Sequence, residues 1–512
     1  MLNAIRKGVS WLDAKLNNPL EETANNLKWL ELELEAWLNS KERADQIKAD
    51  MYYRDIQDIA KYKRMAIGEG GELEEVKNLP NHKVIDNQYK RLVNQKVNHL
   101  VGKPFTVNTN NKTYVDMLNK YFNKKFMKTL KSVGKDANNG GVSFFYSYYV
   151  APYYDNNELK FKRFKSYEIK VFWKDDEHNE IDFFWRYYRK PVRFSNGSVE
   201  DIQHLEVYTL EGVRYYIYKG GTLLYDKLKG ATTYSYLTYT SSVGNEVVEE
   251  QHLSFERIPL IPFKVSDIEE PLLKRVKSLQ DGINTITTVF TNNMLEDSRN
   301  TILIIMNYDG ENLGEFRRNL STYGAIKVRN TNEEKGGVDT LQIEVNAENY
   351  KTILEMFKKA LIQNGGGVDV TELRASGTPN QMNIQSMYYD IELDTNDTET
   401  EFQYSMELLK WFIDFDINYQ GKGNFFDEKV EFIFNRDMLQ DETSIIDNLV
   451  KLKGIISDED IIKQLPFGDS QKLIENMKKQ KEEQRHEVLK EYANAFVNNP
   501  QNNPQINNEG DE

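Results

Sequence analysis

The sequence predicts an α+β protein, mainly helical, with helical segments on both sides of a β-rich middle region. Apolar residues recur every three or four positions through much of the chain before residue 142 and after residue 265. Between these parts, residues 142–264 consist of short aromatic and β-branched runs separated by turn signals such as YDNNE, SNGS and KGGT. With 512 residues, of which 39% are hydrophobic, the chain is long enough to form more than one packed region.

Three helical segments are expected before the β region. Residues 20–66 carry leucines three or four positions apart with charged residues between them: Leu27, Leu30, Leu34 and Leu38. Residues 84–101 repeat this pattern, and Gly102 with Pro104 should end that helix. A third helix is expected over 113–137, closing at the sequence NNGG.

Aromatic residues mark the expected strands of the middle region. They concentrate in FFYSYYVAPYY (144–154), FFWRYY (183–188) and YYIY (215–218), which indicates an antiparallel β region. The region ends with IPLIPF (258–263). Its two prolines predict an extended connector that does not belong to a central strand.

A long amphipathic helix is expected over 271–297, with Pro271 in its first turn. Its apolar stripe steps by three or four residues: Leu272, Val276, Leu279, Ile283, Ile286, Phe290 and Met294. Roughly 27 residues at the helical rise give a rod of about 40 Å. A small α/β insert should follow, with strands at 301–306, 325–329 and 341–345 and a short helix at 311–320.

The carboxyl-terminal part should return to long helices. A helix over 347–363 leads into the glycine-rich loop 364–383, and another helix is expected over 384–416. One strand (429–434) and further helices to about residue 495 follow, and the polar segment 496–512 should be disordered. A structureless loop of this length between two strong helices is usually functional or a linker.

Composition narrows the function classes. The absence of cysteine excludes a thiol nucleophile and a cysteine-ligated metal, and the six scattered histidines form no metal-binding pair. A net charge of −14 opposes a mainly electrostatic grip on nucleic acid. Without a secretory pattern or an apolar run near 18 residues, we expect a soluble, intracellular protein that needs no cofactor and no membrane.

Two acidic clusters leave a choice between metal binding and local structure. The first cluster is Asp175, Asp176 and Glu177, and the second spans Asp458 to Asp460. Either could bind Mg²⁺, which would fit a Mg²⁺-dependent nuclease or packaging enzyme. The simpler interpretation is a charged turn for the first cluster and a helix N-cap with first-turn acids for the second. No catalytic motif in the sequence argues for an enzyme.

Several motifs, in order, resemble the portal proteins of long-tailed double-stranded DNA bacteriophages that infect Gram-positive bacteria. The motifs are MYYRDIQDI, NQYKRLVNQKVNHLVGKPF, NNGGVSFFYSYYV, HLEVYT, RIPLIPFK, LLKRVKSLQDGINTITTVFTNNMLED and VEFIFNRDMLQDETSIIDNLVKLKGIISDEDIIKQLPF. The resemblance covers most of the chain. The segments 310–340 and 365–383 match the family only in position and length.

The resemblance implies a ring of about twelve subunits (a dodecamer) at one capsid vertex of the virion. Such a ring, assembled in the host cytoplasm, is the head-tail connector through which the terminase large subunit packages DNA and through which the genome is later ejected. It also implies docking of the scaffold protein, the major capsid protein and a head-completion or adaptor protein. The implied regions are a wing (1–264), a stem helix (265–297), a clip (298–345), a second stem helix (346–363), a tunnel loop (364–383), a long wing helix and strand (384–439), a crown (440–495) and a disordered tail (496–512).

Three sets of residues follow from this resemblance. The expected tunnel loop that contacts DNA contains Gly365, Gly366, Gly367, Val368, Val370, Leu373 and Arg374. Possible DNA guides on the stem are Lys274, Arg275 and Lys277, although a solvated outer face is an equal alternative. The expected stem packing residues are Leu279, Ile283, Ile286 and Phe290. Another structural head or tail protein, in which the loop is a surface connector, remains an alternative.

Overall fold

The computed structural model describes residues 22–67, 71–76, 79–149, 159–227, 229, 237–243, 246–253, 255–296, 301–307, 312–323, 327–329, 336–342, 347–369, 381–436, 446, 449–465 and 470–497. The chain divides into two units. The first contains residues 1–369 and 390–437, and the second contains residues 370–389 and 438–512. The segment 496–512, which the sequence predicts to be disordered, lies outside the described residues from residue 498 onward.

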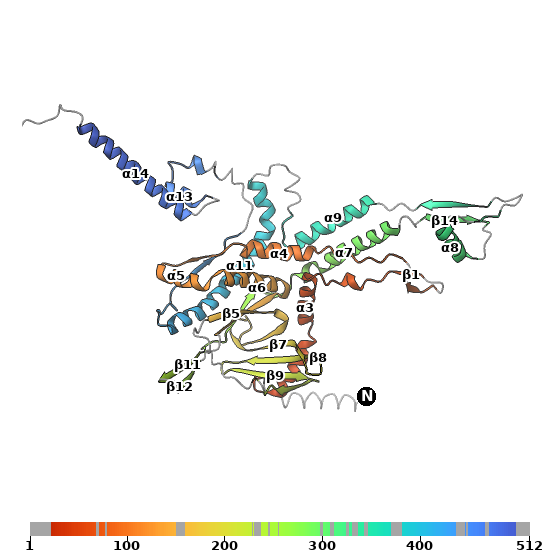
Figure 1. Ribbon diagram of the computed structural model, residues 1–512, viewed down its shortest axis with the longest axis horizontal. Coiled ribbons are helices and arrows are strands. Elements are labelled where there is room, and N and C mark those ends of the chain that lie inside the picture. The colour runs from red at the N-terminus through yellow and green to blue at the C-terminus, as the bar shows by residue number, and fades with distance from the viewer. Residues whose placement is uncertain are drawn as a thin grey trace, which may run out of the picture. The chain divides into compact units, whose positions relative to one another are not determined.

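Helices make up about half of the described structure, which is a mixed α+β protein with antiparallel sheets. The helices, coloured along the chain in Figure 1, are α2 (Leu27–Leu38), α3 (Lys41–Tyr53), α4 (Gln88–Val101), α5 (Lys112–Tyr121), α6 (Lys124–Gly140), α7 (Leu273–Glu296), α8 (Leu313–Tyr323), α9 (Ala347–Asn364), α11 (Gln381–Tyr419), α13 (Asp458–Lys463) and α14 (Ser470–Val497), with short 3₁₀ turns η1 (Asp58–Lys61) and η2 (Ser166–Glu168).

The strands form small antiparallel sheets. They are β1 (Met65–Ile67), β2 (Leu73–Glu75), β3 (Thr106–Asn108), β4 (Val142–Tyr149), β5 (Leu159–Phe164), β6 (Ile169–Trp173), β7 (Ile181–Arg193), β8 (Val199–Tyr208), β9 (Val213–Lys219), β10 (Thr222–Tyr225), β11 (Leu237–Val243), β12 (Glu246–Leu253), β13 (Leu260–Lys264), β14 (Thr301–Met306), β15 (Gly337–Gln342) and β16 (Glu431–Ile433). The two larger sheets have the orders β10-β9-β8-β7-β6 and β13-β4-β5.

Capping side chains divide two of the helical segments that the sequence pattern predicts. The segment 20–66 contains α2 and α3, and the break lies at Ser40, whose hydroxyl accepts from the amide of Arg43 (3.3 Å). The segment 113–137 contains α5 and α6, and the carboxamide of Asn123 accepts from the amides of Lys125 (2.9 Å) and Phe126 (3.1 Å). The prediction of one helix over 113–137 was wrong because a capping side chain starts a new helix without interrupting the apolar period. The helical prediction for 20–66 was wrong at its end, since α3 ends at Tyr53 and β1 begins at Met65.

The antiparallel β region is confirmed, with one correction at its end. The segment 258–263 was expected to be a connector, but residues 260–264 form β13, which pairs with β4. Pro262 lies opposite Phe144 in this pairing. Because β13 is an edge strand of its sheet, the missing N–H of proline is tolerated there.

Helix α2 covers one face of the five-stranded sheet. Leu30, Leu34 and Trp37 from α2 pack against Trp185 of β7 and Leu205 of β8 in a separate apolar core. The ring of Trp37 meets that of Trp185 edge-on, with centroids 6.1 Å apart. The apolar face of α2 therefore packs on a sheet whose strands lie far away in the sequence.

The main core surrounds the three-stranded sheet. Phe145 of β4, Phe263 of β13 and Phe402 of α11 are fully buried and meet edge-to-face, with ring centroids 5.2 Å and 5.1 Å apart. A buried carboxylate fixes the end of α11. Asp416 accepts hydrogen bonds from the hydroxyls of Tyr121 (2.6 Å) and Tyr149 (2.7 Å). Among the described residues, no helix is both long and apolar enough to cross a membrane.

In the small α/β insert, the strand at 301–306 and a short helix after it are confirmed, and β15 begins four residues before the strand expected at 341–345. Strand β14 pairs with β15 over 301–306 and 337–342, and α8 lies between them in the chain. Part of the expected strand at 325–329 lies outside the described residues. The end of the expected strand at 341–345 also lies outside them.

The close of α6 at the NNGG sequence depends on a glycine that we expect to be irreplaceable. Gly141 has φ +81°, and a Cβ there would lie 1.8 Å from the carbonyl oxygen of Glu269. Gly197 has a similar φ of +84° but no neighbouring atom within 4 Å, so it provides a matched control. Gly197→Ala should cost about 1 kcal/mol of unfolding free energy from backbone strain. Gly141→Ala should cost about 2 kcal/mol more, because backbone atoms must also move apart.

Urea unfolding of both variants measures this difference. Equal losses at the two positions would contradict the close approach of residues 141 and 269.

Candidate functional site: the α7–α9 pair and its anchors

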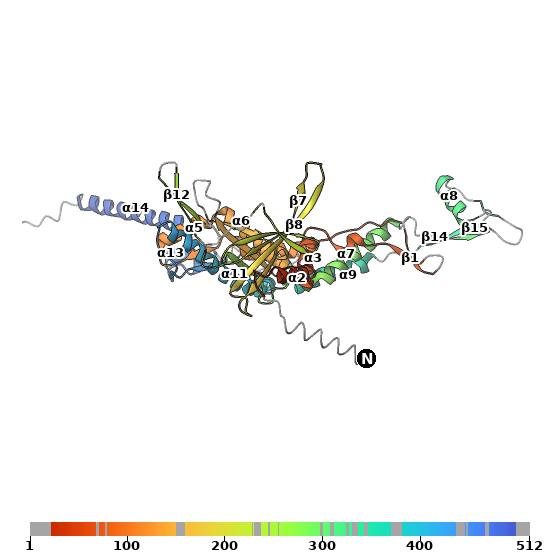
Figure 2. The ribbon, with the colours of Figure 1, turned by 90° about the horizontal axis from the view of Figure 1, so that it is seen from below.

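Helices α7 and α9 lie side by side in both views of the structure (Figures 1 and 2). Gly282 of α7 allows close contact, since a Cβ there would lie 2.7 Å from the ring of Phe357 on α9. Further along, the rings of Phe290 and Tyr350 are 5.1 Å apart. The bounds of the two helices agree with the rods expected over 271–297 and 347–363 to within two residues at each end.

A second face of α7 is polar and yet buried. Four uncharged polar side chains lie one helical step of four residues apart and are at most 2% exposed: Gln280, Asn284, Thr288 and Asn292. They bond the backbone of a segment that precedes α4, where the amide of His82 donates to Asn292 (2.7 Å), that of Val84 to Thr288 (3.0 Å) and that of Asp86 to Asn284 (3.0 Å). The amide of Tyr89 donates to Gln280 (2.9 Å). We call these four side chains and their backbone partners the polar ladder.

The ladder works because two repeats match. Two residues of extended chain advance about 6.6 Å, and four residues of helix advance about 6.0 Å. Every second residue of the segment can therefore bond every fourth residue of α7. Lys358 of α9 reaches the same segment, and its ammonium lies 2.7 Å from the carboxylate of Asp86. This polar stripe of α7 is therefore buried within its own chain.

The three glycines after α9 form a helix cap. The amide of Gly367 donates to the carbonyl of Ile362 (2.9 Å), and that of Gly366 donates to the carbonyl of Gln363 (3.1 Å). This pair of bonds is the Schellman motif, and Gly366 supplies the required positive φ of +61°.

The cap packs tightly on α4. A Cβ at Gly365 or Gly367 would lie 2.2 Å or 2.5 Å from the side chain of Leu92. The carboxamide of Gln95 holds Val368 by donating to its carbonyl (2.7 Å) and accepting from its amide (3.3 Å).

Only part of the expected tunnel loop, residues 364–369 and 381–383, belongs to the described structure. Gly365, Gly366, Gly367 and Val368 are buried, and the hydrogen bonds of the cap and of Gln95 hold them in place. Val370, Leu373 and Arg374 lie outside the described residues. The following helix, α11, begins at Gln381, three residues earlier than expected. DNA contact by the loop stays a prediction.

A buried charge cluster joins the cap to α11. The ammonium of Lys96 is 8% exposed, contacts the carboxylate of Asp394 and donates to the carbonyl of Gly365 (3.3 Å). Arg275 of α7 binds the same carboxylate (2.8 Å). Burial, with a smaller contribution from Arg275, lowers the pKa of Lys96, whereas contact with Asp394 favours its charged form. One turn away on α4, His99 lies 2.8 Å from Glu392 of α11.

The three expected DNA guides on α7 all have carboxylate partners in the same chain. Lys274 pairs with Glu270, and Arg275 pairs with Asp394. Lys277 lies 2.6 Å from Asp281 and 3.0 Å from Asp58, and Lys48 of α3 also binds Asp58 (2.7 Å). Their positive charge is therefore largely compensated. A guiding role for one of them stays a prediction.

The expected stem packing residues divide into two groups. Ile283 is fully buried in the main core of its own chain, and Leu279 packs against that core. Ile286 and Phe290 are half-buried. Beyond them, Met294 is 49% exposed, and on α9 Met356 is 59% exposed. The first half of the apolar stripe therefore packs into the core of its own subunit. The second half leaves apolar side chains exposed within the described chain.

Both acidic clusters have local structural roles. The carboxylate of Asp175 closes a turn by accepting from the amides of Asn179 (2.9 Å) and Glu180 (2.6 Å), and these bonds lower its pKa. At the second cluster, Ser457 is the N-cap of α13, and Asp458 binds Lys481 (2.7 Å). Among the described residues, no group of three His, Asp or Glu side chains is placed to hold a metal ion.

Comparison with known proteins finds a match to one family over nearly the whole chain. Residues 35–487 match the family described as Phage portal protein, SPP1 Gp6-like. The portal protein of Bacillus phage SPP1 is 28% identical over 426 residues, which cover 82% of this chain and 80% of the relative. The portal protein of Clostridium phage phiCD119 is 24% identical over 436 residues, which cover 83% of this chain and 90% of the relative.

Removing one rung of the polar ladder should weaken the attachment of α7. Asn284→Leu keeps a similar volume but leaves the buried amide of Asp86 without its acceptor, which should cost about 1–3 kcal/mol. Asn293→Leu, at a half-buried position outside the ladder and more than two turns further along the same helix, is the control. Hydrogen exchange should accelerate at residues 82–89 only in the first variant. Unchanged exchange there would show that the ladder contributes little to the stability of this segment.

The Asp58 cluster should contribute to acid sensitivity. Burial opposes ionisation of Asp58, but hydrogen bonds from Lys48 and Lys277 outweigh it and lower its pKa. Because the folded-state pKa is depressed, the stabilisation is complete above about pH 4 and is lost as the pH falls below it. Asp58→Asn should therefore lower the melting temperature at pH 7, and its difference from wild type should shrink below about pH 4.

Thermal melts across pH measure this effect, with exposed Asp116→Asn as the control for losing one carboxylate. A difference that grows as the pH falls would contradict the assigned direction.

Proposed function

Because the chain belongs to the SPP1 Gp6-like phage portal protein family, a structural and non-enzymatic family of the virion, we propose that it forms a ring at one capsid vertex and that double-stranded DNA passes through the ring. The observation that carries the proposal is the family match over residues 35–487, which includes both helices of the α7–α9 pair. The nuclease alternative has no support, since both acidic clusters are occupied by local bonds.

The ring would be closed by contacts between identical subunits standing side by side. A heterologous interface that repeats by rotation closes into a cyclic assembly, here of about twelve subunits. The apolar side chains left exposed on α7 and α9, Met294, Leu295, Ile353 and Met356, are suitable for such contacts. In this proposal α7 and α9 are the stem helices, residues 298–345 are the clip, and the carboxyl-terminal helices form the crown.

A loosely held duplex suits a channel through which DNA must move. The chain has a net charge of −14, and the stem cations Lys274, Arg275 and Lys277 are paired with carboxylates. We propose that the segment 370–380 contacts the DNA, carrying Val370, Leu373 and Arg374. The capped glycines would act as its fixed base rather than as part of its moving tip.

The same ring would dock the other proteins of head assembly. We propose the terminase large subunit, scaffold protein, major capsid protein and a head-completion or adaptor protein as partners. These proteins would give the ring its roles in packaging and in ejection of the genome.

Deleting residues 370–380 should separate assembly from packaging. The base of the segment, from the glycine cap to Val368, remains intact, so the variant should still form rings in negative-stain images. In a phage whose portal gene carries the deletion, the yield of DNA-filled heads should fall by about tenfold or more, because contact with the moving duplex is lost.

The control removes an equal number of residues from the carboxyl terminus, 502–512, and should package normally. Full packaging by the 370–380 deletion would remove the DNA-contacting role of the segment. A wild-type protein that stays monomeric under all assembly conditions would instead contradict the ring itself.

A further inference from the structure

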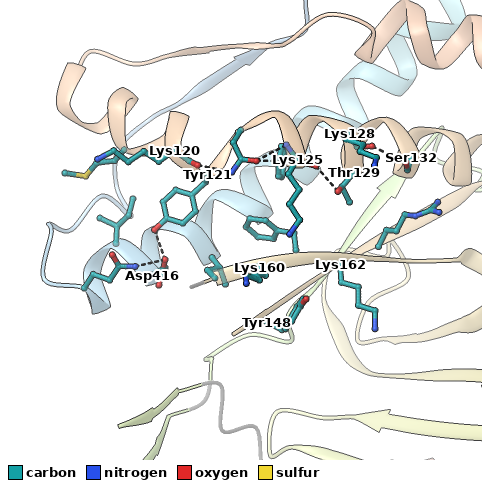
Figure 3. A pocket seen from close by; sticks show the side chains of 18 of the residues that line it. Lys120, Tyr121, Lys125, Lys128, Thr129, Ser132, Tyr148, Lys160, Lys162 and Asp416 are labelled. Atoms are coloured by element: carbon teal, nitrogen blue, oxygen red, sulfur yellow. Dashed lines mark hydrogen bonds between the residues drawn. The ribbon is translucent and has the colours of Figure 1, made fainter. Parts of the chain in front are cut away.

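A groove rich in lysine runs between α6 and β5 (Figure 3). It has a volume of about 730 Å³, and seven of its described lining side chains are cationic: Lys120, Lys125, Lys128, Lys160, Lys162, Arg163 and Lys422. One carboxylate, Asp416, also lines it, and the hydroxyls of Tyr121 and Tyr149 already bond that group. Arg163 also pairs with Asp136, so the positive charge of the groove comes mainly from its lysines, on a chain whose net charge is −14.

The groove follows the edge of a β-sheet. Five consecutive residues of β5, from Leu159 to Arg163, line it. Successive side chains of a strand point to opposite faces, so a cavity that touches all five must lie along the edge of the strand. In the described sheet β5 is the terminal strand and pairs with β4 alone. Its outer backbone N–H and C=O groups are thus placed to pair with another strand.

The two sides of the edge have different chemistry. On the side of α6, Phe161 packs against Phe126 with ring centroids 5.7 Å apart, and the exposed lysines Lys125 and Lys128 stand above them. On the other side, Lys162 lies over the ring of Phe164, with its nitrogen 5.4 Å from the centroid. Burial and the nearby Arg186 lower the pKa of Lys162, so an anion bound beside it would restore its preference for the charged form.

We propose that the edge of β5 binds an extended acidic segment of a partner protein, which adds to the sheet as a further antiparallel or parallel strand. Main-chain hydrogen bonds to β5 would provide the affinity, and alternate acidic side chains would reach the lysines on either side. Small apolar side chains of the segment would contact Phe161 and Leu159. The inference goes beyond the ring and channel and does not depend on them.

A peptide strand fits this surface better than a nucleic acid does. A phosphate backbone carries acceptors only, so it would leave the outward carbonyl groups of β5 without donors and would place negative charge beside them. A peptide supplies both donors and acceptors at the spacing of a strand. The lysines would attract any anion, but only a peptide can also form the hydrogen bonds that the edge of β5 offers.

Fluorescence anisotropy with the full-length protein tests the proposal. The probe is a labelled peptide of about ten residues in which Glu and Val alternate. It should bind, and its affinity should fall as salt is raised. Lys125→Glu combined with Lys128→Glu should weaken binding about tenfold or more. The matched control, Lys219→Glu with Lys227→Glu, reverses two exposed lysines of the five-stranded sheet region and should change binding less than about twofold.

Hydrogen exchange locates the bound peptide. Its binding should protect amides of residues 159–164 and leave those of β9 unchanged. Should the double Glu variant fail to fold, Lys125→Gln with Lys128→Gln should still weaken binding about threefold. Failure of the peptide to bind, binding without protection of β5, or equal competition by duplex DNA would each overturn the proposal, the last in favour of a nucleic-acid site.

Discussion

The bonding of α7 to the segment before α4 is the constraint on which the rest of the site depends. Gln280, Asn284, Thr288 and Asn292 satisfy backbone amides of an irregular segment at the places where it packs against α7. Because the helix and the segment have nearly equal repeats, the bonds continue along three turns. They fix the rotation of α7, and this rotation determines that Gly282 and Phe290 face α9.

Much of the fold could be predicted from periodicity, and the errors have local causes. The apolar steps from Leu272 to Phe290 predict α7 to within two residues. Periodicity does not reveal Ser40 or Asn123, since a cap changes the backbone without changing the apolar stripe. It also treats the ladder residues as solvent-facing. The signal in the sequence was that all four positions, spaced by four residues, carry an uncharged amide or hydroxyl. Such groups cost less free energy to bury than charged groups do, so they can form a buried polar stripe.

Of the electrostatic properties, only the net charge could be predicted from the sequence. The net charge of −14 suggests a surface that repels phosphate, and the pairing of the stem cations with Glu270, Asp394 and Asp281 agrees with that. The net charge does not reveal the groove where lysines of α6 and lysines of β5 come together, although the two groups are more than 20 residues apart in sequence. Only the fold brings Lys128 and Lys160 to one groove. The burial of the glycine cap on Leu92 was similarly invisible, because the partner lies on a helix far earlier in the chain.

The way Val368 is held has a mechanical consequence. Gln95 bonds both backbone groups of this residue, and Lys96 holds the carbonyl of Gly365. If the chain were pulled from beyond Asp369, the bonds to Gln95 and Lys96 would therefore transfer the force to α4 and the main core. The last turn of α9 would be stretched only after these bonds had broken. Helix α9 is shielded from unravelling, and the load is shared by the most deeply packed part of the subunit.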